Sequence, residues 1–232
     1  MSLLPAACMV LAAGFGTRMG ALTKTRPKPM IEVAGKPLLD HALDQAHQGG
    51  VERIVVNAHY LADQVISHLE DRSGVTVLHE TPEILDSGGG VFNALPHLGQ
   101  APFWVMNSDN IWSGPNPLQQ LAQAWDPALM DGLMLLVPLS RTIGRDHADE
   151  LSMTPSGALQ FASSDLVYTG AQILSPAVFN ECSGGAFPIR PLWEDLARQG
   201  RLHGVLYDGH WADVGQPSGI ALAEAMLEMA EP

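Results

Sequence analysis

The start of the chain constrains its fold most. Residues 6–12 (AACMVLA) form an uninterrupted apolar run, and a glycine-containing stretch, residues 13–20, follows at once. A strand that is apolar on both faces is typical of a parallel sheet with helices on both sides. Parallel strands need long crossover connections, which are usually helical. The first 20 residues therefore predict an α/β fold.

Strands and helices continue to alternate through the first half of the chain. The spacing of apolar residues predicts a helix over residues 38–46, with Pro37 at its first position and a stop at Gly49 and Gly50. We expect a further helix at residues 61–69 and strands at residues 53–57, 75–78 and 103–106. This alternation indicates βαβ units and a mostly parallel sheet.

The second half is less regular. Apolar runs predict strands at residues 133–139, 203–207 and 211–214, the last two around a turn at Gly209. Residues 150–174 are expected to form shorter strands with polar turns, and helices are expected at residues 191–199 and 218–229. No internal repeat or linker is visible, so all 232 residues are expected to form one domain.

The charge of the chain is unevenly distributed. Twelve Lys+Arg against 25 Asp+Glu give a net charge of −13, which argues against nucleic acid as a partner, because phosphate backbones attract basic surfaces. The window from residue 18 to residue 36 is the exception. It holds five cations and only Glu32 against them, so it carries +4 and the rest of the chain −17. This contrast predicts a local anion site on an acidic protein.

The glycine stretch and these cations together are suited to a triphosphate. Gly14 and Gly16 follow the first strand and would let backbone N–H groups approach phosphate oxygens, while Arg18 and Lys28 add charged donors. An ordinary strand-to-helix turn with exposed cations is the alternative. A Walker A loop is excluded because its Gly-Lys-Ser/Thr end is missing. The dinucleotide fingerprint fails as well, because Gly20 comes one position late and no acid ends the second strand.

Two aspartates are candidate metal ligands. Asp109 and Asp213 each follow an apolar run, and open parallel sheets place their ligand sites at the ends of such strands. Carboxylates there suit Mg²⁺, which takes one or two of them together with substrate phosphates. Alternatively, Asp109 caps the next segment and Asp213 makes a turn hydrogen bond. The two cysteines, Cys8 and Cys182, form neither a disulfide framework nor a metal cluster.

Five separated motifs resemble one enzyme family in the same order. Residues 11–19 (LAAGFGTRM) with 27–30 (PKPM) resemble the signature of the nucleotide-sugar pyrophosphorylases, which are sugar-1-phosphate nucleotidyltransferases. Residues 86–90 (DSGGG) look like their base-recognition loop, and residues 107–109 (NSD) and 211–215 (WADVG) like their two metal aspartates. Residues 88–96, 179–192 and 209–215 are most similar to the short bacterial N-acetylmuramic acid 1-phosphate uridylyltransferases. Ser108, Gln216 and residues 141–150 depart from the family pattern.

The resemblance implies a fold and a set of site residues. The fold would be a three-layer, Rossmann-like α/β/α sandwich with a mostly parallel mixed sheet, with a nucleotide-binding half at about residues 1–112, a sugar-binding half at about 113–232, and no C-terminal β-helix. The implied catalytic residues are Arg18, Lys28, Asp109 and Asp213, of which the two aspartates hold Mg²⁺. The implied nucleotide-binding residues are Leu11, Ala12, Ala13, Gly14, Gly16, Thr17, Arg18, Lys28, Asn57, Ser87, Gly88 and Gly89. The implied sugar-binding residues are Asn107, Thr169, Gly170 and Trp211.

The resemblance also implies a reaction. A nucleoside monophosphate would pass from an NTP to a sugar 1-phosphate with release of pyrophosphate, and UTP with N-acetylmuramic acid 1-phosphate would give UDP-N-acetylmuramic acid in cell-wall recycling. Other readings stay open: mannose, heptose or glucose 1-phosphate with GTP or dTTP, phosphocholine with CTP, or a non-catalytic sensor subunit. Without a visible leader or an apolar run of about 20 residues, we expect a cytoplasmic monomer or small homo-oligomer that binds no membrane.

Overall fold

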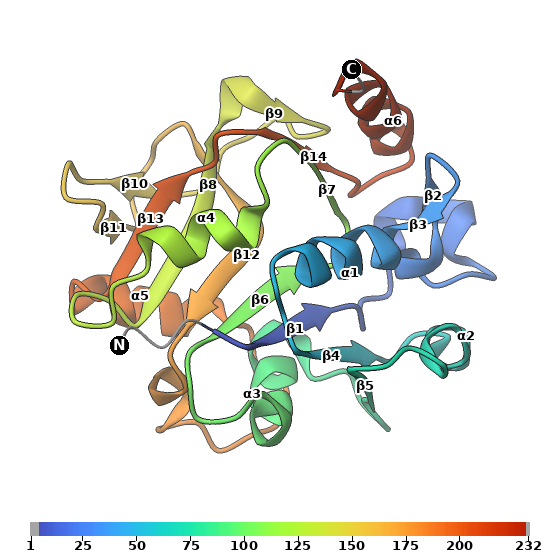
Figure 1. The fold of residues 1–232 in the computed structure, drawn as a ribbon, viewed down its shortest axis with the longest axis horizontal. Coiled ribbons are helices and arrows are strands. Elements are labelled where there is room, and N and C mark those ends of the chain that lie inside the picture. The colour runs from blue at the N-terminus through green and yellow to red at the C-terminus, as the bar shows by residue number, and fades with distance from the viewer. Residues whose placement is uncertain (1–4, 231–232) are drawn as a thin grey trace.

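A seven-stranded sheet forms the centre of the molecule (Figure 1). The computed structural model describes residues 5–230. The strand order is β13-β8-β12-β6-β1-β4-β5. These strands are β1 (Ala7–Leu11), β4 (Arg53–Ala58), β5 (Val75–His79), β6 (Phe103–Asn107), β8 (Gly132–Pro138), β12 (Leu166–Leu174) and β13 (Leu202–Leu206). Only β12 runs antiparallel to its neighbours β6 and β8, so the expected mixed, mostly parallel sheet is confirmed.

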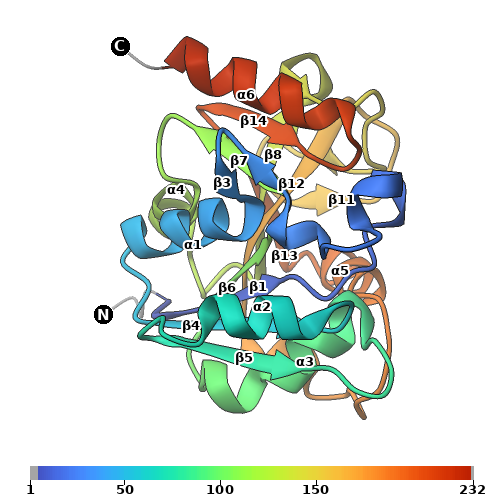
Figure 2. The same ribbon diagram turned by 90° about the vertical axis from the view of Figure 1, so that its right-hand side faces the viewer.

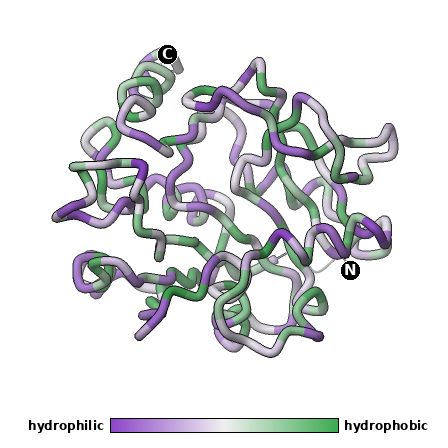
Figure 3. The backbone as a smooth tube through the Cα atoms, turned by 180° about the vertical axis from the view of Figure 1, so that it is seen from behind, coloured by the Kyte–Doolittle hydropathy of each residue, from purple (hydrophilic) through white to green (hydrophobic). Residues whose placement is uncertain are grey.

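Helices cover both faces of this sheet. The six helices within residues 5–230 are α1 (Leu38–Gln48), α2 (Ala62–Leu69), α3 (Asp86–Leu98), α4 (Pro117–Ala124), α5 (Arg190–Arg198) and α6 (Ser218–Ala230). Side chains alternate along β1: Cys8 and Val10 join a cluster with α1, α2 and α4, whereas Ala7 and Met9 join one with α3. This two-sided burial explains why residues 6–12 are apolar throughout. Figure 3 shows green, hydrophobic stretches in the middle of the molecule and purple, hydrophilic ones along much of its outer edge.

A three-stranded sheet lies beside the main one, under α6 (Figure 2). It consists of β7 (Asn110–Ser113), β14 (His210–Asp213) and β9 (Thr142–Ile143), in the order β7-β14-β9. The two strands predicted around Gly209 therefore exist but belong to different sheets, because β13 pairs with β8 and β14 pairs with β7 and β9. The chain crosses from one sheet to the other at this turn.

Three local predictions need correction. Pro37 ends the short strand β3 (Lys36–Pro37) and is the N-cap of α1, not its first helical residue. Residues 150–174 contain the expected short strands, β10 (Ser152–Met153) and β11 (Leu159–Gln160), but also the nine-residue β12. Residues 86–90, which we expected as a loop, form the first turn of α3. Strand β2 (Glu32–Val33) pairs with β3.

None of the helices in the described part of the chain is both long and apolar enough to span a bilayer.

Candidate active site

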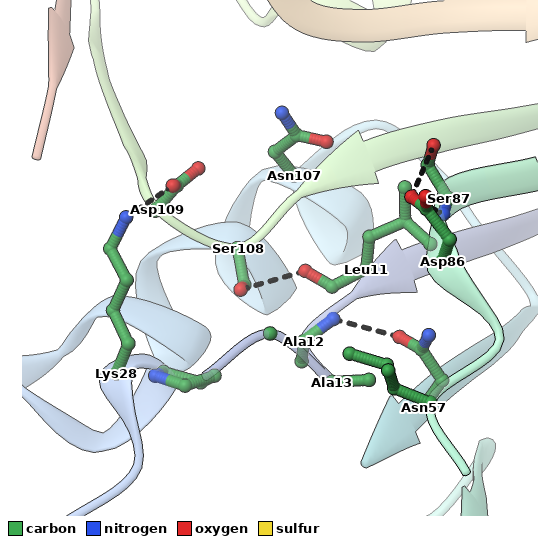
Figure 4. Close-up of a pocket in the computed structure, with 13 residues that line it drawn as sticks. Leu11, Ala12, Ala13, Lys28, Asn57, Asp86, Ser87, Asn107, Ser108 and Asp109 are labelled. Carbon is green, nitrogen blue, oxygen red and sulfur yellow. Dashed lines mark hydrogen bonds and ion pairs between the residues drawn. The ribbon is translucent and has the colours of Figure 1, made fainter. Parts of the chain in front are cut away.

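A pocket opens where β1, β4 and β6 end, and it collects many of the predicted site residues (Figure 4). Its lining residues are Leu11, Ala12, Ala13, Gly14, Lys28, Pro29, Asn57, Ile84, Asp86, Ser87, Asn107, Ser108 and Asp109. Figure 4 shows Ala12 and Ala13 between two ends of the pocket: Lys28 and Asp109 on one side, and Asp86 and Ser87 on the other. The carboxyl ends of parallel strands thus form the site, as open α/β sheets favour.

A buried polar chain holds the glycine loop in place. The Ala12 N–H donates to Asn57 Oδ1 (2.8 Å), and Asn57 Nδ2 donates to Glu80 Oε1 (2.7 Å). Glu80 Oε2 in turn accepts from the Leu85 N–H (2.8 Å), just before α3. Asn57 therefore lies in the pocket wall but positions the loop. The sequence did not point to Glu80, although this residue directly follows the last residue of β5.

Ser108 fastens the same loop from the other side. Its hydroxyl donates to the Leu11 carbonyl at 2.8 Å, and its backbone N–H points to the same oxygen at 3.2 Å. A glycine at this position would keep only the backbone bond. The Ser108 hydroxyl thus adds a second hydrogen bond between the ends of β1 and β6.

The predicted cations surround the two aspartates. Lys28 Nζ lies 2.5 Å from Asp109 Oδ2, and both side chains are largely buried. Gly16 is the N-cap of the 3₁₀ helix Thr17–Thr23, which carries Arg18. A Cβ built on Gly215 would lie 3.0 Å from Asp213 Oδ1 and 3.1 Å from Arg18 Nη1, so the Arg18 guanidinium and the Asp213 carboxylate both lie beside this glycine.

The chain topology brings Asp109 and Asp213 together. Strand β14 pairs with β7 so that Asp213 is opposite Asn110, and the Val214 N–H donates to the Asp109 carbonyl (3.0 Å). The expectation that both aspartates end strands of the parallel sheet is wrong in detail. Asp109 lies in the turn between β6 and β7, and Asp213 ends a strand of the small sheet.

The electrostatics of this pair suit a cation. Burial raises the pKa of Asp213, and the neighbouring Asp109 carboxylate raises it further, whereas Lys28, Arg145 and Arg18 oppose the shift. The two carboxylates are close enough to influence each other and are hard oxygen donors of the kind that Mg²⁺ prefers. Among residues 5–230 no cluster of three or more His, Cys, Asp or Glu side chains could hold a metal. Asp109 and Asp213 supply two carboxylates, and Mg²⁺ usually takes one or two carboxylates together with substrate phosphates.

Gly88 and Gly89 do not offer their N–H groups to a ligand. Both N–H groups donate to the Phe187 carbonyl, at 2.9 and 3.0 Å, and both residues are buried in the first turn of α3. A Cβ on Gly88 would strike the Phe187 ring, and one on Gly89 the Gly185 carbonyl. Glycine is therefore needed here for close packing. Of the three residues predicted to contact the base in this segment, only Ser87 reaches the pocket.

The predicted sugar contacts also divide. Asn107 lines the pocket. Thr169 and Trp211 have side chains at 0 % and 1 % exposure, and they bond to the protein instead: the Thr169 hydroxyl donates to the Leu135 carbonyl and the Trp211 indole to the Thr169 carbonyl. Gly170 is buried beneath Asn107 and Asn110. In this structure the Thr169 and Trp211 side chains therefore face the core rather than the pocket, and Gly170 has no side chain with which to reach it.

Arg145 is a second residue that sequence reasoning missed. Its guanidinium lies 3.9 Å from Asp213 and 2.6 Å from Asp149. It comes from residues 141–150, where the resemblance is poor, and strand β9 brings this segment beside Asp213. A lone arginine in a poorly matching segment gives no pattern by which to find it.

Comparisons with known proteins place the chain in a family. Residues 8–138 match the model of the MobA-like NTP transferase domain. The chain is 39% identical over 242 residues to N-acetylmuramate alpha-1-phosphate uridylyltransferase of Caulobacter vibrioides, covering 99% of this chain and 100% of that protein. It is 31% identical over 229 residues to the protein of the same name from Neisseria meningitidis serogroup B, covering 94% and 96%.

Solved structures share the fold. The inositol-1-phosphate CTP transferase from T. maritima superimposes with a TM-score of 0.78 over 100% of both chains, at 16% identity. A UDP-glucose pyrophosphorylase complexed with UDP-glucose gives a TM-score of 0.75, covering 98% of this chain and 100% of that one, at 19% identity.

Proposed function

We propose that this chain, which belongs to the MobA-like NTP transferase family, uses UTP and N-acetylmuramate 1-phosphate to make UDP-N-acetylmuramate. The reaction class is that of its relatives: a nucleoside monophosphate passes from an NTP to a sugar 1-phosphate, and pyrophosphate leaves. The full-length likeness to two uridylyltransferases of this name supports the choice of substrates. Because the product carries an activated cell-wall sugar, we assign the reaction to peptidoglycan recycling and, since it consumes an NTP, to the cytoplasm.

One observation carries the proposal. Lys28 and Asp109 meet at 2.5 Å at one end of a pocket that Ala12, Ala13 and Gly14 floor. A base resting on these small residues would direct its triphosphate toward Lys28 and Arg18. The pocket thus has room for a nucleoside at one end and charge for phosphates at the other.

The chemistry needs no protein nucleophile. An oxygen of the sugar phosphate attacks the α-phosphorus, and the bond to the departing pyrophosphate breaks in line with it. Lys28 would neutralise charge on the oxygens around the α-phosphorus, and Arg18 would hold the triphosphate and the leaving pyrophosphate. Positioning and charge neutralisation are the means by which such sites accelerate phosphoryl transfer.

Mg²⁺ is the proposed cofactor, held by Asp109 and Asp213. When bound, it would neutralise phosphate charge at the junction of the two substrates. The closeness of the two carboxylates, which together with burial raises the pKa of Asp213, supports this assignment.

A substrate matrix tests the proposal. UTP, GTP, CTP and dTTP are each combined with the 1-phosphates of N-acetylmuramate, mannose, heptose and glucose, and with phosphocholine, and pyrophosphate release is measured with and without Mg²⁺. We expect turnover to be highest with UTP and N-acetylmuramate 1-phosphate and to require Mg²⁺. Turnover confined to GTP with mannose or heptose 1-phosphate contradicts the assignment. Tight nucleotide binding without turnover for any pair favours a sensor.

A substitution tests the site separately. Asp109→Ala should lower kcat by about 10³-fold, in the range seen when one stabilising group is lost from an active site. Circular dichroism should report an unchanged fold. Glu228→Ala, on exposed α6, removes the same charge far from the pocket and is the matched control. Wild-type activity in Asp109→Ala contradicts the metal site.

A further inference from the structure

The positive groups assigned so far all come from the first half of the chain, yet the second substrate also carries a phosphate. Arg18 and Lys28 precede residue 30, and none of the three lysines lies beyond residue 36. The sugar 1-phosphate brings two further negative charges to the α-phosphorus. A cation on the opposite wall would offset that charge.

Only one cation from residues 113–230 lies by the aspartate pair. Arg141 donates to the Gly209 carbonyl, Arg190 binds Glu150 and Glu194, Arg198 binds Asp195, and Arg201 binds Asp131. Arg145 is the exception, with Nη1 3.9 Å from Asp213 Oδ2. Its side chain is 20 % exposed, so it is not closed off from solvent.

The surroundings of Arg145 fix its direction. Its Nη2 donates to Asp149 Oδ1 (2.6 Å), while Asp149 Oδ2 accepts from the Tyr168 N–H of β12 (2.7 Å). The backbone is fixed as well: the Thr142 hydroxyl donates to the Arg145 carbonyl (3.2 Å), and Gly144, at φ +80°, passes so close to the Asp213 carbonyl that a Cβ would collide with it. The guanidinium is therefore anchored on one edge by β12.

The other edge of the guanidinium is available. The hydrogen bonds of Arg145 within residues 5–230 use Nε and Nη2, whereas Nη1 stays beyond hydrogen-bond distance of Asp213. A planar fork with one edge anchored and one edge toward a site is preorganised for an oxyanion, and arginine is suited to phosphate recognition. An anion beside Asp213 would find this edge ready.

We propose that Arg145 binds the 1-phosphate of the incoming sugar 1-phosphate through Nη1 and orients it toward the α-phosphorus. This assignment rests on the proposed nucleotidyl transfer, because it is the attacking phosphate that must come closest to Asp109 and Asp213. The carboxylate of N-acetylmuramate is attached to the sugar ring at a distance from that phosphate. Phosphate recognition thus predicts the same role for Arg145 with any sugar 1-phosphate.

Steady-state kinetics test the proposal with Arg145→Gln, Arg145→Lys and the matched control Arg198→Gln, which removes the same charge from the exposed end of α5. A charge-assisted hydrogen bond contributes about 1.5–3 kcal/mol, so Arg145→Gln should raise the KM for the sugar 1-phosphate, or lower the kcat/KM for it, by about 10- to 100-fold. The KM for the NTP should change less than about threefold. For Arg145→Lys, the KM for the sugar 1-phosphate should lie between those of the wild type and Arg145→Gln, because lysine retains the charge but lacks the planar guanidinium.

Two sugars separate the phosphate from the carboxylate. N-acetylglucosamine 1-phosphate lacks the carboxylate and is measured as a substrate or, where it is not turned over, as a competitive inhibitor. A similar loss with both sugars supports the proposal, and a loss confined to N-acetylmuramate 1-phosphate overturns it in favour of carboxylate recognition. Unchanged KM and kcat values in a folded Arg145→Gln also overturn it. A wild-type protein that turns over no sugar 1-phosphate refutes the proposed function itself, and this inference with it.

Discussion

At the scale of single residues, the Asn57–Glu80 chain has only one possible arrangement of donors and acceptors. The backbone N–H of Ala12 makes Asn57 Oδ1 the acceptor, so Asn57 Nδ2 must donate to Glu80. The Leu85 N–H is also a donor, so both oxygens of Glu80 must accept. A carboxylate can do this, whereas a glutamine amide would turn an NH₂ toward one of the two donors.

Glu80→Gln should therefore destabilise the protein despite its near-identical shape. Glu80 is 2 % exposed, and a buried donor left without an acceptor costs about 1–3 kcal/mol. Chemical denaturation should report this loss in the free energy of unfolding, together with a higher KM for the NTP, because the loop at Ala12 loosens. Glu83→Gln makes the same change at an exposed position and should change neither the free energy of unfolding nor the KM for the NTP. Equal stability of the two variants would falsify the arrangement.

Asp213 illustrates a conflict between stability and function. Burial and Asp109 raise the pKa of Asp213 in the folded protein. At a pH above both its folded-state and its unfolded-state pKa, the charged carboxylate therefore destabilises the fold. This cost disappears as the pH falls and the group becomes protonated in both states. Asp213→Asn should accordingly raise the Tm at pH 7 in EDTA, and the difference from wild type should vanish toward pH 3. The kcat should fall by about 10²- to 10³-fold. A lower Tm at pH 7 would contradict the assigned electrostatics.

Of the residues predicted in the first strand–loop–cation segment, Leu11, Ala12, Ala13, Gly14 and Lys28 line the pocket, whereas Gly16, Thr17 and Arg18 do not. Lys28 and Asp109, 81 positions apart, do meet. Glu80 and Arg145 escaped prediction because their roles depend on partners in distant strands. Thr169 and Trp211 failed for the opposite reason: their residue types suit a sugar, but the alternation of their strands turns them into the core.

At the scale of elements, α3 begins with a sequence that disfavours helix. Three consecutive glycines each lower helix propensity by about 1 kcal/mol relative to alanine. Tertiary contacts override this cost, because the first turn packs directly on residues 185–187, and Phe187 accepts two of its free N–H groups. The loop prediction for residues 86–90 came from the family resemblance and did not anticipate these contacts.

Gly89→Ala should thus lower stability although alanine is the better helix former. Its Cβ would collide with the Gly185 carbonyl, and such overpacking costs about 1–3 kcal/mol, more than the propensity gained. At about 2–4 °C per kcal/mol for a chain of this size, the Tm should fall by several degrees in thermal denaturation. Asn93→Ala, at an exposed position of α3, should leave the Tm unchanged or raise it. An increase in Tm for Gly89→Ala would show that α3 is not packed at this point.

The strands of the parallel sheet were predictable because each is a short apolar run bounded by polar or glycine residues. Residues 53–57, 75–78 and 103–106 lie within β4, β5 and β6. Their partners were not predictable. The small sheet joins β7, β9 and β14 from three distant segments, and no residue pattern within any one of them indicates that pairing.

At the scale of the whole molecule, the two halves expected from the sequence share one sheet. Strand β6 of the first half pairs with β1 on one side and with β12 of the second half on the other, while β7 pairs with β14. The boundary near residue 112 therefore divides the sequence but does not divide the sheet into two separate units. The proposed metal ligands show the same division, since Asp109 and Asp213 come from different halves.

This shared sheet predicts one cooperative unfolding transition for the full chain. Far-UV and near-UV circular dichroism should give coincident melting curves, because neither half keeps a closed core when the other unfolds. Residues 1–112 and 113–232, produced separately, should each lack a cooperative transition: the first fragment exposes the β12-facing edge of β6, and the second loses β6 beside β12 and β7 beside β14. A cooperative transition in the isolated first fragment would instead make the nucleotide-binding half an independent domain. The Lys28–Asp109 pair would then form without residues 113–232.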